Sequence, residues 1–268
     1  MDQHIILIAF LLTLFAGLST GIGGLLALLA KHTNTNFLSL SLGLSAGVML
    51  YVSFMEMMPI ALSSLSDGYG EKQGTLYMII SFFGGMLLIT LIDFLVPKSS
   101  NPHEIHSVEE MNQTTTINKR LQHTGFITAL SIAIHNFPEG IATFMSSLGS
   151  MDVAIPIAAA IAIHNIPEGI AVAVPIYHAT NSRQKALWLS LLSGLAEPIG
   201  ALVAYLFLMS FWTPITHGII MAAVAGIMVF ISLDELLPSA EKYGKHHLSI
   251  IGVVSGMAIM ALSLYLFV

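Results

Sequence analysis

The chain has 268 residues, of which 55% are hydrophobic and only 9% are charged, and its mean hydropathy is +0.83. This composition is typical of a polytopic membrane protein. The formal net charge of −6 leaves no basic surface for nucleic acid, and the lack of cysteine in the sequence excludes disulfides and thiolate ligands. Any metal site must therefore use nitrogen and oxygen ligands.

Apolar runs of roughly 20 residues or more predict an all-α fold with eight transmembrane helices. The runs lie near residues 5–30, 37–62, 75–97, 124–147, 152–177, 186–210, 214–238 and 247–267. The first run is too long for a signal-peptide core and has no lysine or arginine before it, so we expect a retained span. Only residues 98–123 have a soluble composition, and we expect a mobile loop there. The sequence thus predicts one transmembrane domain over residues 1–268.

The nine lysine and arginine residues divide unequally between the predicted loops. Lys72 is the one basic residue in an even-numbered loop. The odd-numbered loops hold the other eight: Lys31, Lys98, Lys119, Arg120, Arg183, Lys185, Lys242 and Lys245. By the positive-inside rule, the odd-numbered loops lie in the cytoplasm and both termini lie outside. We therefore predict a multi-pass protein of the cell membrane, surrounded by the lipid bilayer.

One polar motif occurs twice in the middle of the chain. Residues 133–142 read AIHNFPEGIA, and residues 162–171 read AIHNIPEGIA. In each copy the His and Glu are four residues apart, so on a helix they lie ~40° apart around the axis and ~6 Å apart along it. Both side chains can therefore face one ion. The proline of each copy frees a backbone carbonyl and bends the helix beside this pair.

A second repeat lies on either side of the central motifs. Residues 46–59 read AGVMLYVSFMEMMP and residues 225–238 read AGIMVFISLDELLP, with six of fourteen positions identical. In the predicted topology these two segments run in opposite directions, as do the fourth and fifth spans. Opposed repeats around interrupted helices are typical of secondary transporters with a binding site near the midplane. We predict inverted repeats, with spans 1–3 and 6–8 around spans 4–5; chance similarity between apolar helices is the alternative.

Carboxylates occur in the predicted spans, although no span contains lysine or arginine. They are Glu56, Asp93, Glu139, Glu168, Glu197, Asp234 and Glu235. A carboxylate in hydrocarbon must be protonated, hydrated or matched by a cation, and these spans supply no cation. We interpret the four nearer to span ends as hydrated interfacial groups. Glu139, Glu168 and Glu197 lie near the midpoints of their spans and favour a bound cation.

The two central motifs together offer a set of metal ligands. Two imidazoles and two carboxylates come from His135, Glu139, His164 and Glu168. This set suits a borderline divalent ion such as zinc. Asn136 and Asn165 could join Glu197 in a neighbouring site of harder oxygen ligands. Interhelical amide hydrogen bonds are an equally good interpretation of the two asparagines.

The boxes HNFPEG at 135–140 and HNIPEG at 164–169, with Glu197 in the next span, resemble the ZIP family of divalent-metal transporters, in particular its bacterial zinc-uptake branch. The resemblance covers essentially the whole chain and implies a binuclear centre. It assigns Glu139, His164 and Glu168 to one site, with His135 beside them. The implied second site contains Asn136, Asn165 and Glu197, with Glu139 and Glu168 bridging both ions.

The resemblance implies uptake of zinc into the cytoplasm, either passive or coupled to protons, with iron and manganese open as further cargo. It implies no enzyme activity and no catalytic cofactor; the transported ions are Zn²⁺ and, as an open question, Fe²⁺. An exporter of the same fold is an alternative, because ligand spacing does not set the direction of flux. A metal-dependent intramembrane hydrolase is another, although the sequence lacks His-Glu-x-x-His. The oligomeric state is not fixed by the sequence, and a homodimer stays open.

Overall fold

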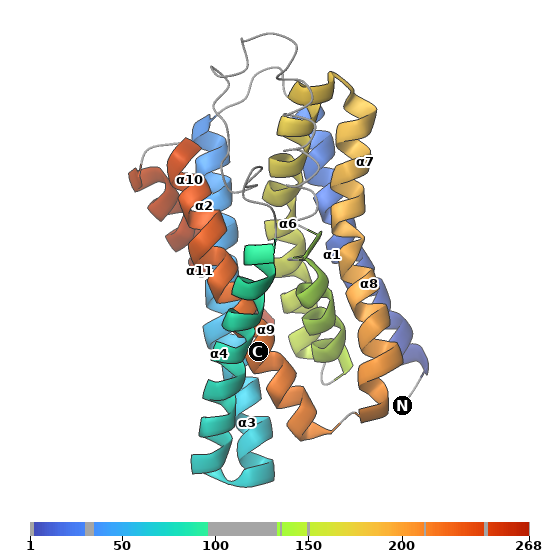
Figure 1. Ribbon diagram of the computed structural model, residues 1–268, viewed down its shortest axis with the longest axis vertical. Helices are drawn as coiled ribbons and strands as arrows, with labels where there is room; N and C mark the ends of the chain where they lie inside the picture. The colour runs from blue at the N-terminus through green and yellow to red at the C-terminus, as the bar shows by residue number, and fades with distance from the viewer. Residues whose placement is uncertain are drawn as a thin grey trace.

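The computed structural model describes residues 3–29, 35–95, 133–134, 136–148, 151–211, 213–243 and 246–267. Within these ranges every regular element is a helix (Figure 1). This agrees with the predicted all-α class, because in lipid a helix satisfies its own backbone hydrogen bonds. The predicted loop at 98–123 and the candidate ligand His135 lie outside the described residues.

The helices follow the predicted apolar runs closely. In chain order they are α1 (Gln3–Leu29), α2 (Thr35–Val52), η1 (Ser53–Met57), α3 (Met58–Tyr69), α4 (Glu71–Leu95), a helix at 136–148, α6 (Met151–Thr180), α7 (Arg183–Gly194), α8 (Ala196–Val203), η4 (Ala204–Leu208), η5 (Met209–Phe211), α9 (Pro214–Ile231), η6 (Ser232–Leu236), α10 (Leu237–Tyr243) and α11 (His246–Phe267). Several of these elements join end to end without a break, so that α2, η1 and α3 form one long helix.

In the described part of the chain, six helical stretches are long and apolar enough to cross a membrane. They are Gln3–Leu29, Ser39–Tyr69, Glu71–Phe94, Arg183–Phe211, Pro214–Glu241 and His246–Leu266. These match the predicted spans 1–3 and 6–8. Helix α6 covers the fifth predicted span and continues through Pro167, while the fourth is described only in part. The protein is therefore a multi-pass, all-helical membrane protein, and the count of eight spans stays a prediction.

Local sequence explains where several helices begin and end. Gly70, with φ +80°, forms the tight turn between α3 and α4, a backbone conformation that glycine adopts without strain. Ser182 caps α7 by accepting a hydrogen bond from the backbone N–H of Lys185 at 3.3 Å. Thr213 and Thr216 form a reciprocal capping box at the start of α9.

The outer repeat contains two matching π-helical segments, η1 and η6. In each, the first residue is a serine that donates a hydrogen bond to the carbonyl four residues back, Ser53 to Met49 at 2.8 Å and Ser232 to Met228 at 2.7 Å. A proline follows each segment, and its missing N–H removes one α-helical bond. The first helix continues to Tyr69, so Glu56 lies in mid-helix, half-buried. The expectation that Glu56 lies near a span end was wrong.

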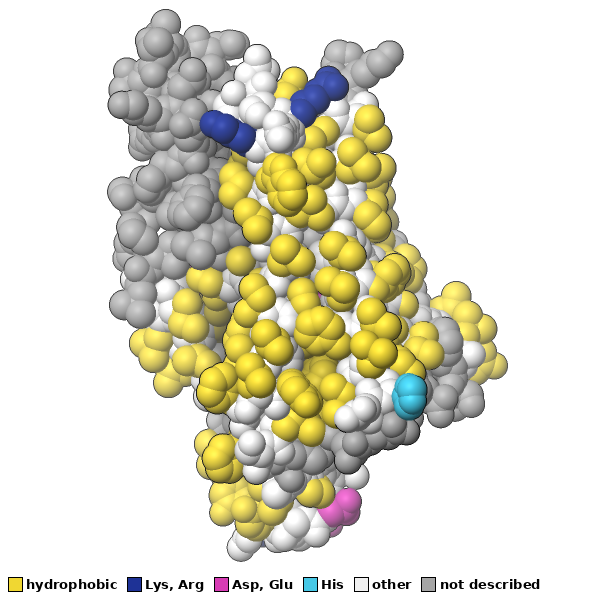
Figure 2. Space-filling view, turned by 90° about the vertical axis from the view of Figure 1, so that its right-hand side faces the viewer, with side chains coloured by type: hydrophobic (Ala, Val, Ile, Leu, Met, Phe, Trp, Pro, Cys, Tyr) yellow, Lys and Arg dark blue, Asp and Glu magenta, His cyan; other side chains and the backbone are white. Residues whose placement is uncertain are grey.

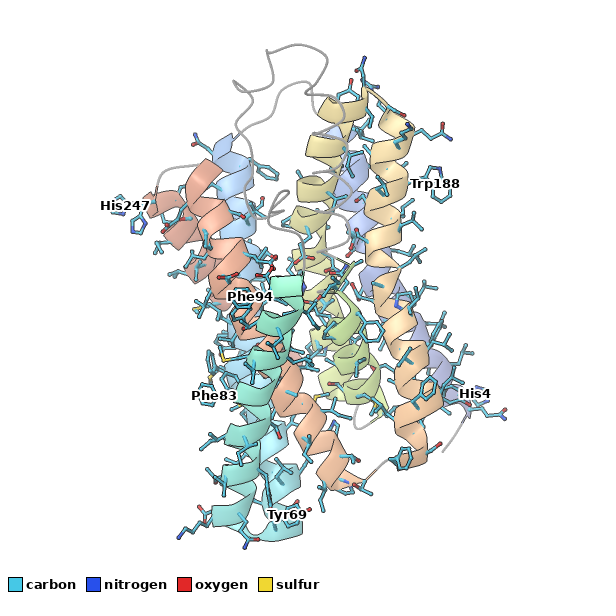
Figure 3. All side chains as sticks on the ribbon, viewed as in Figure 1. His4, Tyr69, Phe83, Phe94, Trp188 and His247 are labelled. Atoms are coloured by element: carbon cyan, nitrogen blue, oxygen red, sulfur yellow. The ribbon has the colours of Figure 1, made fainter. Side chains whose placement is uncertain are left out.

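Two groups of helices lie side by side along the long axis (Figure 1). One group contains α1, α6, α7 and α8, and the other contains α2, α3, α4, α9 and α11, with α2 packed against α6 between them. Large apolar side chains cover the outside: Phe83 is 61% exposed, Trp188 is 57% exposed, and both point away from the bundle (Figure 3). Figure 2 shows the same apolar surface on one face, with lysine and arginine at one end. A surface of this kind faces lipid.

Candidate metal centre

Three elements carry the predicted ligands into the interior of the bundle: the helix at 136–148, α6 and α8. All six described candidates are at most 3% exposed: Asn136, Glu139, His164, Asn165, Glu168 and Glu197. Polar side chains are rarely buried to this extent without a purpose, because each loses its hydration. The basic residues in the described part of the chain do not offset this charge, since they lie in the first or last turn of their helices: Lys72, Arg183, Lys185 and Lys242.

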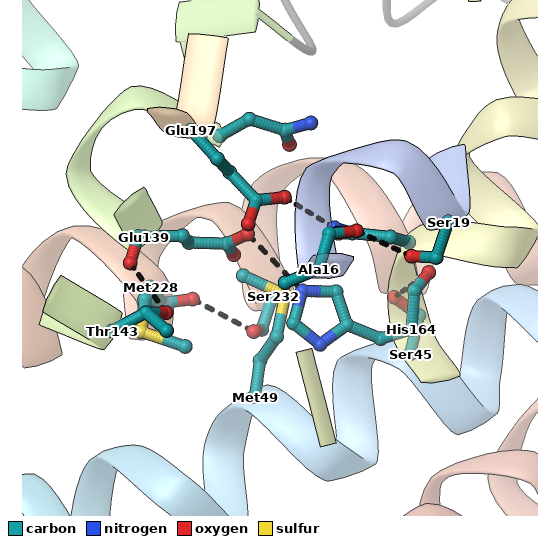
Figure 4. A network of polar contacts seen from close by, with 12 residues as sticks. Ala16, Ser19, Ser45, Met49, Glu139, Thr143, His164, Glu197, Met228 and Ser232 are labelled. Carbon is teal, nitrogen blue, oxygen red and sulfur yellow. Dashed lines mark hydrogen bonds and ion pairs between the residues drawn. The ribbon is translucent and has the colours of Figure 1, made fainter. Parts of the chain in front are cut away.

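Glu139 and His164 are in direct contact. Nε2 of His164 lies 3.2 Å from Oε2 of Glu139 (Figure 4). Zinc holds its nitrogen and oxygen ligands at about 2.0–2.2 Å in a tetrahedron, so two ligand atoms of one zinc ion lie about 3.3 Å apart. The other carboxylate oxygen of Glu139, Oε1, is buried and makes no hydrogen bond to any described residue. This pair therefore has the spacing and the spare acceptor that zinc binding needs.

The amide of Asn165 joins three helices. Its Nδ2 donates to the Ala16 carbonyl of α1 at 2.9 Å and to Oε1 of Glu197 in α8. Its own oxygen, Oδ1, and the second oxygen of Glu197, Oε2, have no hydrogen-bond partner among the described residues. The amide nitrogen thus makes interhelical hydrogen bonds, the alternative interpretation of the two asparagines given above. The amide oxygen stays available to a cation. Asn136 makes a similar bond, from Nδ2 to the Ser193 carbonyl at 3.4 Å.

The carboxylates of the centre are close enough to influence one another. Glu168 interacts electrostatically with Glu139, His164 and Glu235, and Glu197 interacts with Glu139 and Glu168. The sequence placed Glu235 at a span end, whereas the structure brings it near Glu168. Its signal in the sequence was the outer repeat, in which Glu56 and Glu235 occupy the same position. Negative charge concentrated in this way attracts a cation.

The glycine of each motif brings two backbones into contact. A Cβ on Gly140 would overlap the backbone carbonyl of Glu197, and a Cβ on Gly169 would overlap the backbone carbonyl of Thr20. Only glycine allows this approach. The helix at 136–148 is thereby held against α8, and α6 is held against α1. The role of these two glycines is not visible in the sequence, because the sequence does not show which helices meet.

No group of three or more His, Asp or Glu side chains in the described ranges is arranged closely enough to hold one metal ion. The structure brings together Glu139 with His164 and Asn165 with Glu197, and it places Glu168 near the first pair. A complete ligand set, whether for one ion or two, is therefore still a prediction for this chain.

Comparison with known proteins identifies the class. The ZIP Zinc transporter family matches residues 95–264. The zinc transporter ZupT of Streptococcus mutans serotype c is 58% identical over 268 residues, which cover all of both chains. The ZupT of Chlorobium luteolum is 59% identical over 258 residues, 96% of this chain and 97% of that one. That of Lysinibacillus sphaericus is 59% identical over 270 residues and the whole of both.

This chain belongs to the ZIP zinc transporter family. Members of this family are transporters and not enzymes, which confirms the resemblance noted in the sequence. The intramembrane hydrolase is thereby excluded.

Proposed function

We propose that this protein carries zinc across the cell membrane into the cytoplasm, and that the buried centre binds the ion on its way. The observation that carries the proposal is the contact between His164 and Glu139, whose ligand atoms are spaced as zinc requires. The relatives of similar length are named zinc transporters, which supports the choice of cargo. The direction of flux follows the family's bacterial zinc-uptake branch.

The proposed centre is binuclear, and its two sites differ in ligand hardness. Zinc would bind Glu139, His164 and Glu168, with His135 beside them. The second ion would bind the oxygen-rich set, which consists of Asn136, Asn165 and Glu197 together with the bridging carboxylates Glu139 and Glu168. Carboxylate and amide oxygens suit iron or manganese better than imidazole does. Carboxylates that are protonated before binding would release protons when metal enters.

The proposed architecture has eight spans, with both termini outside and inverted repeats formed by spans 1–3 and 6–8. Matching contacts on the two sides of the centre support it: Gly140 meets Glu197, and Gly169 meets Thr20. The matching π-helical segments η1 and η6 also support it. Rocking of the repeats about a fixed site would expose the ions first outside and then to the cytoplasm.

Purified protein in liposomes tests this function directly. We expect saturable zinc uptake that empty liposomes do not show, measured with zinc, iron, manganese and cadmium, with and without a pH gradient. Uptake that is faster when the outside is more acidic than the inside would indicate proton coupling. Uptake that does not respond to the pH gradient would indicate passive flux. If reconstituted protein moves none of these metals in either direction, the proposal is wrong, whereas net zinc movement out of cells would favour the exporter.

The orientation follows from the basic residues and can be tested without background labelling, because the chain has no cysteine. A cysteine in place of Ser107, in the segment outside the described residues, should react only with reagents that reach the cytoplasm. Intact cells and permeabilised cells would be labelled side by side with an impermeant maleimide. Labelling of intact cells at this position would reverse the proposed topology.

The two proposed sites should respond differently to substitution. We expect His164→Ala to reduce zinc uptake more than manganese uptake, because imidazole is a ligand only of the zinc site. We expect Glu197→Gln to change the ratio of manganese to zinc uptake while part of the zinc uptake remains. Initial rates for both metals at matched protein levels measure this. Equal loss of every metal in both variants would indicate one indivisible site.

A further inference from the structure

Helix α1 carries no residue of the predicted centre, yet its contacts repeat those that surround Glu197. In both places an asparagine amide donates to a backbone carbonyl. The glycine of the same motif then contacts the residue that lies four positions after this acceptor in the chain. The matched contacts are Asn165–Ala16 with Asn136–Ser193, Gly169–Thr20 with Gly140–Glu197, and Ile166–Gly23 with Phe137–Gly200. Thr20 therefore occupies on α1 the place that Glu197 occupies on α8.

The hydroxyl of Thr20 lacks the partner that a helical threonine normally has. Five other threonines of the described helices donate to the carbonyl four residues back: Thr13, Thr75, Thr90, Thr143 and Thr180. For Thr20 that carbonyl belongs to Ala16, which already accepts from Ser19 Oγ at 2.5 Å and from Asn165 Nδ2 at 2.9 Å (Figure 4). Thr20 is 0% exposed, and its Oγ1 makes no hydrogen bond to any described residue.

The position of Thr20 explains what this hydroxyl can reach. Its Oγ1 lies 2.9 Å from the point where a Cβ on Gly194 would be, and its backbone carbonyl meets Gly169, the neighbour of Glu168. Thr20 thus lies between the helix that carries Glu168 and the turn that precedes Glu197. A buried hydroxyl without a partner is unfavourable, and its oxygen is a neutral, hard ligand.

We propose that Thr20 is a further cation-binding residue of this centre, whose hydroxyl oxygen contacts the transported zinc ion directly or through one water molecule. The proposal rests on the proposed function. It places a neutral oxygen on α1 where the matching position of α8 holds a carboxylate. The centre then has ligands from α1 as well as from the helix at 136–148, α6 and α8, and its two sides differ in charge.

The test compares Thr20→Val, which keeps the shape and removes the hydroxyl, with Thr20→Ser, which keeps the hydroxyl. In proteoliposomes, the zinc concentration for half-maximal uptake should rise about fivefold in Thr20→Val, the effect of losing one neutral contact, and should stay within about twofold of wild type in Thr20→Ser. Thr13→Val is the matched control, because Thr13 is equally buried on α1 but donates to Ala9 at 2.9 Å.

Thermal stability gives a second readout that a packing role would not produce. Without zinc, Thr20→Val should melt at or above the wild-type temperature, because it removes an unpartnered hydroxyl, whereas Thr13→Val should melt lower. Added zinc should raise the melting temperature of Thr20→Val less than that of wild type. The assignment would be overturned if Thr20→Val bound zinc as tightly as wild type does. It would also be overturned if Thr20→Ser lost as much zinc affinity as Thr20→Val. Failure of wild type itself to transport zinc would instead refute the proposed function.

Discussion

Zinc uptake should fall by about 100-fold or more when either Glu139 or Glu168 is changed to Gln. Each carboxylate is proposed to touch both ions, so the substitution removes one negative charge from two sites at once. Loss of a group that merely supports a metal ligand already costs about 10–100-fold in affinity. The measurement is the initial rate of uptake at matched protein levels in proteoliposomes, for zinc and for manganese.

Glu71→Gln serves as the control for these two variants. Glu71 is exposed at the start of α4, so its charge is hydrated and its loss should leave uptake unchanged. Glu139→Gln and Glu168→Gln should also insert and fold, because glutamine has nearly the same shape and is neutral in a buried position. A Glu139→Gln variant that transports zinc at the wild-type rate would remove Glu139 from the centre.

Gly140→Ala should lower uptake by about 100-fold, although it changes no proposed ligand. The added Cβ would overlap the backbone carbonyl of Glu197, so the helix at 136–148 and α8 would have to separate by roughly 1 Å. A displacement of this size costs about 100-fold where reacting groups must be positioned closely. Glu197 and Glu139 lie on the two helices that separate, so their carboxylates would no longer be positioned to bind the metal together.

Gly84→Ala is the matched control for this substitution. Gly84 lies exposed on α4, and a Cβ there would meet no atom within 4 Å. It should leave uptake and melting temperature unchanged. Gly140→Ala uptake within twofold of wild type, in protein that is correctly inserted, would show that this helix contact does not position the centre.

Much of the fold was predictable because lipid reduces the alternatives to a few. Runs of apolar residues long enough to cross a bilayer located the helices near Gln3–Leu29 and His246–Leu266 to within a few residues. The extension of the second helix to Tyr69 was missed, because residues 63–69 are mostly polar or small and the hydropathy signal ends before the helix does. The π-helical segments were missed as well, since i→i+5 bonding leaves no periodic pattern in the sequence.

The candidate centre was predictable in its residue types but not in its contacts. The spacing of His164 and Glu168 within one motif was visible in the sequence, and burial of both is confirmed. The contact that forms, however, joins His164 to Glu139 of the other motif, and no sequence pattern shows which helices face each other. The same reason hid the partnership of Thr20 with Gly169, since the two residues come from distant parts of the chain.

A zinc-bound crystal structure, with the metal located by its anomalous scattering, tests the central claim most directly. We expect a zinc ion about 2.0–2.2 Å from Nε2 of His164 and from a carboxylate oxygen of Glu139, with a carboxylate oxygen of Glu168 in the same shell. Zinc bound in the crystal only at other places, with no anomalous peak between His164 and Glu139, would contradict this.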